Sequence, residues 1–352
     1  MQKFSTKTNT LNTDPTSSDR KKDHIELAFE SQQQVQHIDS RFYYEPILSG
    51  HPTSDSNLER EFASAVYKFP LWVSSMTGGT KYAAIINKNL AKACRQFGLG
   101  MGLGSCRSLL YSDEAFDDFN VRKYIGDRPL FANLGIAQVE ELVQTRKFQK
   151  LKDLVSKLAA DGLIIHINPL QEWTQPEGDR YFHPPLETIA SVLDKLDVPI
   201  IVKEVGQGMG ISSLKALMKL PLAAIDFAAN GGTNFSKLEL LRSDSTRMEA
   251  LSPIVGVGHS ADEMVELTND ILKETEIDIQ CSNFIISGGI KTFLDGYYLI
   301  SKINSPAIYG QASSFLKYAR GSYEDLERYV SLQVEGLKMA NSFLRIKTKN
   351  AL

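Results

Sequence analysis

Cysteine is scarce in this chain, with only three among 352 residues. Cys94, Cys106 and Cys281 stand at unrelated spacings, which excludes a zinc motif and a framework of paired disulfides. A reducing cytoplasm is therefore the expected compartment. The N-terminus lacks an apolar signal core, and no hydrophobic run reaches the length of a membrane span. We expect a cytoplasmic protein with no membrane partner.

An excess of charge of either sign is also missing. The formal net charge is -3 and is spread over the chain, which argues against a nucleic-acid partner. Any anionic ligand must therefore be met by a local group of cations. Hydrophobic residues make up 42% of the chain, and this length can bury a substantial core. The length, charge and hydrophobic content of the chain together predict a folded globular protein.

The chain divides into three stretches by composition. Residues 1–19 are rich in Ser, Thr, Asn and Asp, which predicts a disordered leader. Residues 20–69 predict an irregular N-terminal arm and extension, with a short helical pattern near 25–35. Regular patterning begins at Pro70, and residues 70–345 predict one domain.

Within this domain, short apolar runs alternate with amphipathic helical patterns such as 81–97 and 138–160. Continuous apolar runs suit parallel strands buried on both faces, and eight such units predict a closed (β/α)8 barrel, the TIM barrel. An open doubly wound sheet is the main alternative. The expected strands are 70–76, 99–104, 129–133, 162–168, 199–205, 222–228, 283–287 and 306–311.

Polar residues gather after the fourth run, at residues 166–179, where a barrel forms its ligand site. Asn168 and Gln171 stand close to His166, which favours an active-site role over that of a satisfied strand-end histidine. Glu172 has three readings: metal ligand, general base or loop salt bridge. As a lone carboxylate it best suits Mg²⁺ shared with substrate phosphates.

Glycine-rich turns follow the seventh and eighth runs, at 287–290 and 310–313. Each alone is compatible with an ordinary tight turn, but their joint position favours a phosphate site. The stretches 98–104 and 206–210 lack the third glycine of the dinucleotide fingerprint, which excludes a Rossmann site. Their glycines leave room for a flat ligand or for tight barrel packing.

Lys203 lies inside an apolar run and needs a partner. The alternatives are an ion pair with Glu204 or another strand-end acid, a contact with electron-rich ring atoms of a cofactor, and, less favoured, a Schiff base.

The basic residues 20–24 are either a solvated end or a mobile arm that closes over an anion. Arg107 offers a further guanidinium for phosphate oxygens. The segment 237–262 is longer than a usual βα loop, and it is either a lid or a surface excursion without a role.

Taken together, the motifs between residues 20 and 316 resemble those of type 2 isopentenyl diphosphate isomerase, the flavin-dependent family. The shared motifs are Arg20-Lys21-x-x-His24, Met76-Thr-Gly-Gly79, Gly104-Ser105-x-Arg107, Asn133-Leu-Gly, His166-x-Asn-x-x-Gln-Glu172 with Pro176-Glu-Gly178, Val202-Lys-Glu-Val-Gly206, Gly231-Gly-Thr-Asn234 with Glu239 and Arg242, and Ser287-Gly-Gly289.

The resemblance implies reduced FMN in the barrel mouth, Mg²⁺ held by Glu172, and NADPH as the external reductant. It assigns catalytic roles to Gln171, His166 and Lys203. The implied flavin contacts are Ser75, Met76, Thr77, Ser105, Asn133, Lys203 and Thr233, with the phosphate on Gly289, Ile290, Lys291, Ala312 and Ser313. The implied substrate contacts are Arg20, Lys21, His24, Ser105, Arg107, His166, Asn168 and Gln171.

The resemblance further implies double-bond isomerisation between isopentenyl and dimethylallyl diphosphate, in isoprenoid biosynthesis, by a homo-oligomer such as a tetramer or octamer. The alternatives are an FMN-dependent oxidoreductase, of the 2-hydroxy-acid oxidase or glutamate-synthase type, and a catalytically silent flavin- or phosphate-binding protein. Cys106, Ala228 and Asn230 depart from the family pattern, and Ala312-Ser313 lacks an arginine often found there. We expect these departures to trim phosphate or flavin contacts.

Overall fold

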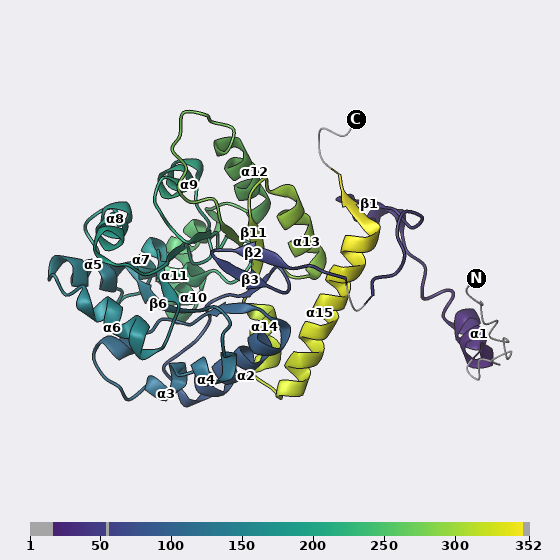
Figure 1. Cartoon of the computed structure of the whole chain (residues 1–352), viewed down its shortest axis with the longest axis horizontal. Coiled ribbons are helices and arrows are strands. Elements are labelled where there is room, and N and C mark those ends of the chain that lie inside the picture. The colour runs from purple at the N-terminus through teal and green to yellow at the C-terminus, as the bar shows by residue number, and fades with distance from the viewer. Residues whose placement is uncertain (1–16, 54–55, 348–352) are drawn as a thin grey trace, which may run out of the picture. The chain divides into compact units, whose positions relative to one another are not determined.

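The computed structural model describes residues 17–53 and 56–347 of the chain (Figure 1). These fall into two units, Met1–Phe42 and Tyr43–Leu352, and each is described by itself. The N-terminal unit contains the helix α1 (Ser17–Glu26) and one short 3-10 turn, η1 (Val35–His37). The helix begins within the stretch predicted to be a disordered leader, of which residues 1–16 lie outside the described part.

The helix predicted near residues 25–35 is wrong, because α1 ends at Glu26 and an irregular segment separates it from η1. The apolar residues of that pattern, among them Ile25, Phe29 and Val35, are exposed. A short helix gains most of its stability from burying such a face, and here the face is not buried.

The second unit is a closed barrel of eight parallel strands, which confirms the predicted TIM barrel and excludes the open sheet. Each strand lies within one of the eight predicted runs or extends it by at most two residues. In barrel order the strands are β4 (Leu71–Val73), β5 (Gly100–Gly102), β6 (Leu130–Gly135), β7 (Gly162–His166), β8 (Ile200–Lys203), β9 (Ala224–Asp226), β10 (Phe284–Ile286) and β11 (Ala307–Gln311).

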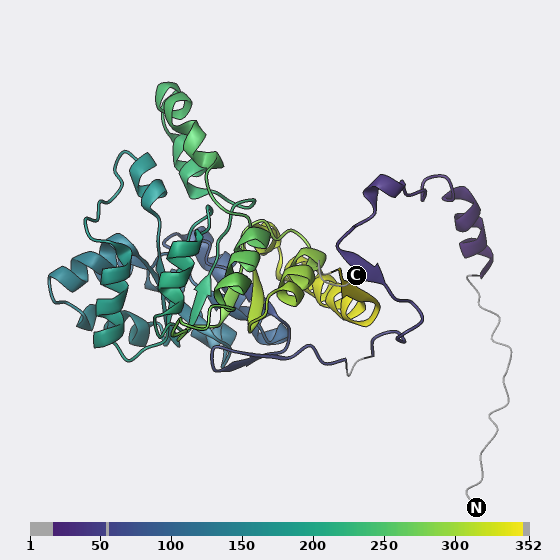
Figure 2. The same cartoon turned by 90° about the horizontal axis from the view of Figure 1, so that it is seen from above.

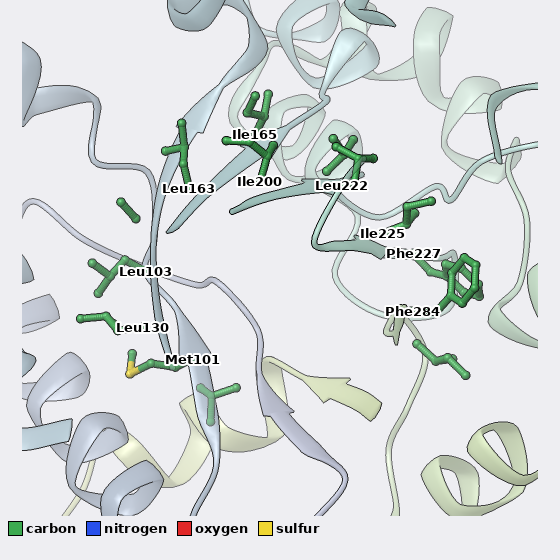
Figure 3. Close-up of a cluster of buried hydrophobic side chains, with 14 of the residues drawn as sticks. Met101, Leu103, Leu130, Leu163, Ile165, Ile200, Leu222, Ile225, Phe227 and Phe284 are labelled. Carbon is green, nitrogen blue, oxygen red and sulfur yellow. The ribbon is translucent and has the colours of Figure 1, made fainter. Parts of the chain in front are cut away.

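Helices cover the outside of the barrel, and the two faces of each strand contact different cores. Residues such as Leu163, Ile165 and Ile200 point outward into a large cluster between strands and helices (Figure 3). The helices of this layer are α2 (Lys81–Phe97), α5 (Ile136–Gln144), α6 (Gln149–Lys157), α8 (Pro185–Lys195), α9 (Ile211–Met218), α12 (Ala261–Ile271), α13 (Phe293–Lys302), α14 (Ser313–Ala319) and α15 (Tyr323–Phe343), with the short η2 (Arg107–Leu110), α3 (Phe116–Phe119) and α4 (Arg122–Ile125).

Local sequence sets the helix ends. The long helix α2 begins at Thr80, whose hydroxyl accepts the N–H of Ala83, and it stops at Gly98, which adopts a left-handed conformation with φ 66°. The predicted helix over 138–160 is instead two helices, α5 and α6. Arg146, with φ 55°, breaks the helical path between them.

A hairpin that the sequence did not predict packs with the inward-facing residues of the barrel. Strands β2 (Arg60–Phe62) and β3 (Ala65–Tyr67) are antiparallel and are joined by Ala63 and Ser64, both with positive φ. Phe62 and Tyr67 join a second buried cluster that is built on Trp72. This cluster also contains Phe131, Ile164, Ile201, Ala224, Ile285 and Ile308.

The glycines of β5 serve this packing. A Cβ on Gly100 would lie 2.6 Å from the Trp72 ring and 2.9 Å from Tyr67, and one on Gly102 would lie 2.5 Å from Ile164. Of the two roles predicted for the alternating glycines, tight barrel packing therefore accounts for these two positions.

The long segment after β9 is helical. It contains α10 (Phe235–Arg242), α11 (Ser245–Leu251) and η3 (Ser252–Gly256), and it projects from the barrel in green in Figure 2. Arg247 donates hydrogen bonds to the carbonyls of Trp173 and Thr174, at 2.9 and 3.1 Å, in the short helix α7 (Pro169–Thr174). The excursion is thus attached to the segment that follows β7.

Beyond the barrel, β1 (Phe42–Tyr44) and β12 (Leu344–Ile346) form a two-stranded sheet. Within residues 17–53 and 56–347, none of the helices is both long and apolar enough to span a bilayer.

Candidate active site

Two pockets open beyond the C-terminal ends of the strands and share Ser75, Lys203, Val205 and Phe235. We call the two together the barrel mouth. One side is lined by Ser74, Gly206, Ala228, Ala229, Gly231, Gly232, Thr233, Ser287, Gly288, Gly289, Ile290, Lys291, Gly310, Gln311, Ala312 and Ser313, and the other by Met76, Gly104, Ser105, Asn133, His166 and Gln171. Most of the predicted flavin residues therefore meet in one place; Thr77 is not among the lining residues.

The glycine-rich side of the mouth is built by Ser287-Gly-Gly289 after β10. Gly288 has φ 91°, and a Cβ there would lie 2.1 Å from the carbonyl oxygen of Ala229, so only glycine fits. The Ser287 hydroxyl donates to Asp226 Oδ1 at 2.5 Å and accepts the N–H of Ala228 at 2.9 Å. These bonds fix the start of the turn and leave its backbone at the mouth.

Two serine hydroxyls have no hydrogen-bond partner within the described part of the chain, Ser74 Oγ and Ser75 Oγ. Both residues line the mouth, and both hydroxyls are buried. A buried hydroxyl without a partner costs free energy, so a ligand atom at this position would stabilise it.

Lys203 ends β8 in the centre of the mouth and is 8% exposed. Its Nζ donates to the carbonyl oxygen of Glu204 at 2.7 Å. The Glu204 carboxylate instead accepts the N–H groups of residues 206–208, at 2.6, 2.6 and 3.0 Å. The predicted ion pair with that carboxylate is therefore replaced by a loop-closing set of backbone bonds.

A second acid to consider for Lys203 is Asp226, its partner in the register of β8 and β9. Burial raises the pKa of the Asp226 carboxyl, and the Lys203 charge opposes that rise. Asp226 Oδ2 is buried and has no hydrogen-bond partner among the described residues. Asp226 stands inside an apolar run of the sequence, and our prediction overlooked this acid.

His166 ends β7, and its Nδ1 lies 2.8 Å from Asn133 Oδ1. The amide of Asn133 is oriented because its Nδ2 donates to the carbonyl of Leu103 at 2.9 Å. Asn133 therefore offers an oxygen, and the imidazole carries its proton on Nδ1. Burial, and to a lesser degree the charge of Lys203, lowers the pKa of His166 to about 3, so the ring is neutral near pH 7.

The helix α7 carries the predicted amide and carboxylate cluster. Asn168 Nδ2 donates to Glu172 Oε1 at 2.9 Å and to Gln171 Oε1 at 3.2 Å. Gln171 Nε2 donates to Glu239 Oε1 of α10 at 3.3 Å, and Gln171 is the member of this cluster that reaches the mouth. Glu239 was part of the family motif but had no predicted role.

Glu172 and Arg107 lie next to the mouth, not among its lining residues, and Asp179 connects them. Burial raises the pKa of Glu172, whose Oε2 accepts the backbone N–H of Asp179 at 2.7 Å. The guanidinium of Arg107 binds the Asp179 carboxylate through Nη1 and Nη2, at 2.5 and 3.3 Å. Residues 17–53 and 56–347 hold no group of three or more His, Cys, Asp or Glu arranged to bind a metal.

The predicted basic arm belongs to the other unit. Arg20, Lys21 and His24 all lie in α1 and are exposed, and Arg20 and His24 are one helical turn apart. A contact between these residues and the substrate stays a prediction.

Of the departures from the family pattern, Cys106 is the one that the structure corrects. Its side chain is buried in the core and does not line the mouth, and burial raises its pKa to about 12. The expectation that it trims a ligand contact is therefore wrong. Ala228 does line the mouth, whereas the Asn230 side chain accepts the N–H of Gly231 at 2.8 Å.

The barrel resembles solved flavoenzyme structures. A mandelate oxidase variant with a monooxide FMN adduct superposes with a TM-score of 0.55 at 12% identity, covering 88% of each chain. A flavocytochrome b2 variant with sulfite bound gives a TM-score of 0.59 at 13% identity, covering 85% of this chain and 71% of the other. At these identities the likeness establishes the shared fold.

Sequence relatives are much closer. A Rickettsia felis protein named isopentenyl-diphosphate delta-isomerase is 34% identical over 334 residues, which cover 91% of each chain. A Rickettsia bellii protein of the same name is 33% identical over 346 residues, which cover 95% of each. No family profile matches the chain. Identity at this level over nearly the full length confirms the family predicted from the motifs, and the chain belongs to the isopentenyl-diphosphate delta-isomerases.

Proposed function

We propose that this protein interconverts isopentenyl and dimethylallyl diphosphate, with reduced FMN and Mg²⁺ bound. The observation that carries the proposal is the barrel mouth. Its glycine-rich turns at 287–290 and 310–313, which we call the phosphate corner, line this mouth together with the side chains of Lys203, His166 and Gln171. The reaction protonates one carbon and deprotonates another without net redox. Reduced FMN, when bound, would supply an electron-rich ring and the acid and base.

The residues present fit FMN. The Ser75 hydroxyl, which has no partner among the described residues, and the positively charged Lys203 suit a polar, electron-rich ring. Met76, Ser105, Asn133 and Thr233 line the mouth and would surround this ring. Gly288 lets the turn after β10 pack against Ala229 at the mouth, where the backbone N–H groups of this turn would bind a phosphate. Its neighbours Gly289, Ile290, Lys291, Ala312 and Ser313 would complete that phosphate site.

The side chains of the mouth would position the substrate. Lys203 uses one of three ammonium N–H groups on the Glu204 carbonyl, which leaves two for ring atoms. Gln171 is held between Asn168 and Glu239, so its amide has a defined orientation toward the reacting carbons. Fixing both partners in this way removes much of the entropy cost of the reaction.

The diphosphate would bind next to α7. Arg107 and His166 would contact its oxygens, with Arg20, Lys21 and His24 contributed by the basic arm. Glu172 would share Mg²⁺ with the substrate. A second hard oxygen, the buried Asn168 Oδ1, has no hydrogen-bond partner in the described residues and lies in the same cluster, which suits such an ion.

The proposal also includes priming of the flavin by NADPH, a homo-oligomer such as a tetramer or octamer, and a cytoplasmic location. The decisive experiment is an anaerobic NMR assay with FMN, a reductant, Mg²⁺ and isopentenyl diphosphate in D₂O. We expect dimethylallyl diphosphate and deuterium incorporation without stoichiometric consumption of reductant. Net oxidation of a substrate would instead identify an FMN-dependent oxidoreductase on the same fold. FMN binding without turnover would identify a catalytically silent flavin-binding protein.

Glu172→Gln tests the metal role within this assay. The variant should retain FMN but lose Mg²⁺-dependent turnover, because an amide binds Mg²⁺ far less strongly than a carboxylate. Glu177→Gln is the matched control, since Glu177 is an exposed acid of the same segment whose ion pair to Arg242 is long, at 3.6 Å. Equal losses in the two variants would contradict a specific role for Glu172.

A further inference from the structure

Asp179, to which the sequence analysis assigned no role, contacts two residues of the proposed diphosphate site, Arg107 and Glu172. Its carboxylate accepts two hydrogen bonds from Arg107 and one from Gln138 Nε2, the latter at 2.7 Å. Its backbone N–H donates to Glu172. One residue therefore contacts both the guanidinium and the carboxylate proposed to hold the diphosphate and its metal.

The segment that carries Asp179 has a separate anchor. Glu140 is buried in α5, and it accepts the backbone N–H groups of Phe182 and His183 at 3.0–3.3 Å, together with His183 Nδ1 at 2.5 Å. Glu140 therefore fixes the chain three to four residues after Asp179. Gln138 of the same helix binds the Asp179 carboxylate itself, so α5 holds both the segment and the group that binds Arg107.

Arg107 needs such orientation. Half of its side chain is exposed, at 51%, and a free arginine samples many rotamers. Two of its five N–H groups bind Asp179, which leaves three directed elsewhere on the same planar group. A guanidinium fixed on one side by a carboxylate presents its remaining donors in a single plane.

We propose that Asp179 is a positioning residue for diphosphate binding. It holds Arg107 in the orientation that meets the phosphate oxygens, and its backbone N–H aligns Glu172 for the metal. This inference rests on the proposed function, in which Arg107 contacts the diphosphate. Loss of the pre-orientation should weaken binding of the diphosphate by about three- to tenfold, the usual cost of ordering one long side chain on binding.

Asp179→Asn is the main variant, because it removes the charge while keeping the shape and the backbone N–H to Glu172. We expect the KM for isopentenyl diphosphate and the Kd for inorganic diphosphate to rise about three- to tenfold. The kcat, the FMN affinity and the Mg²⁺ requirement should stay within twofold of wild type. Asp179→Glu, which restores the charge, should recover part of the affinity.

Asp161→Asn is the matched control. Asp161 also accepts a hydrogen bond from an arginine, Arg122, at 2.8 Å, and one from the backbone N–H of Leu130 at 2.8 Å. It directly precedes β7 and therefore lies at the opposite end of that strand from His166. This variant should leave the KM and the Kd unchanged. A rise equal to that in Asp179→Asn would show that general loosening, not Arg107, is responsible.

A double-mutant cycle separates positioning from a merely structural role. In an Arg107→Gln background, Asp179→Asn should have no further effect on the Kd for inorganic diphosphate, because the group it orients is absent. Additive effects, or an unchanged Kd in the single variant, would overturn the inference. Wild-type protein that binds inorganic diphosphate without isomerase activity would refute the proposed function while leaving this test intact. Wild type that isomerises but does not bind inorganic diphosphate, and whose KM is unchanged in Asp179→Asn, would overturn the inference alone.

Discussion

His166 gives the most quantitative prediction, because its pKa is far from that of a free imidazole. Burial and the charge of Lys203 lower that pKa from 6.5 to about 3 in the folded protein. In the unfolded chain the ring regains its ordinary pKa and binds a proton more readily. Between these two pKa values the unfolded state holds more protons, so acid destabilises the fold through this residue.

The magnitude follows from the two pKa values. At pH 5.0 the unfolded imidazole is almost fully protonated and the folded one is not, which costs the folded state about 2 kcal/mol relative to pH 7.5. The penalty reaches about 4 kcal/mol at pH 3, where the folded ring also begins to bind its proton. Even the smaller value is a large fraction of the stability of an ordinary domain.

Replacement of His166 by Gln removes the titrating ring. The free energy of unfolding, measured with urea, should therefore fall less steeply between pH 7.5 and 5.0 in the variant than in wild type, by about 2 kcal/mol. Fluorescence of the fully buried Trp72 reports the transition. Subtracting the two proteins cancels the contributions of other titrating groups.

His51→Gln is the control, since it removes an exposed imidazole from the same unit. It measures how much of the pH response is caused by losing any surface histidine. If wild type and His166→Gln lose stability in parallel, the imidazole is not held neutral by burial, and the argument for a neutral ring in the mouth fails.

Three further predictions concern positions in the barrel and beside it. Gly288→Ala should abolish FMN retention, measured by flavin absorbance, because its Cβ would collide with the Ala229 carbonyl oxygen at 2.1 Å; full flavin content would contradict the proposed phosphate corner. Trp72→Ala should lower the free energy of unfolding by about 3–5 kcal/mol in urea titrations, because the fully buried ring leaves a cavity; a loss under 1 kcal/mol would show that the interior collapses around it. Glu140→Gln should increase proteolytic cleavage near Phe182 and His183, because a neutral amide accepts the N–H groups of these two residues less strongly than a carboxylate. Unchanged cleavage would show that Glu140 does not anchor this segment.

The barrel was predictable because its strands are continuous apolar runs, for which burial on both faces leaves few alternatives. The hairpin at residues 60–67 was not, because its strands have three residues each and its turn is Ala63-Ser64. Both turn residues have positive φ, a conformation usually signalled by glycine or asparagine. A turn without those residues gives no local signal, and only the packing of Phe62 and Tyr67 explains it.

The site was predictable to a similar extent. Residues such as His166 and Lys203 stand directly after or at the end of apolar runs, so the strand-end rule locates them. Their partners were not predictable, because the bond from Arg107 to Asp179 joins residues 72 positions apart. The same holds for the low pKa of His166, which depends on burial by residues from several strands.

The hydrogen bond that His166 donates to Asn133 makes the position of a proton depend on how the strands are aligned. The Leu103 carbonyl orients the Asn133 amide, and that amide selects the imidazole nitrogen that carries hydrogen. These three residues follow or lie in β5, β6 and β7, so a one-residue slip between any two strands would turn one side chain to the opposite face. Insertions within these strands should therefore be selected against even where the fold survives them, because they would change the tautomer of the ring.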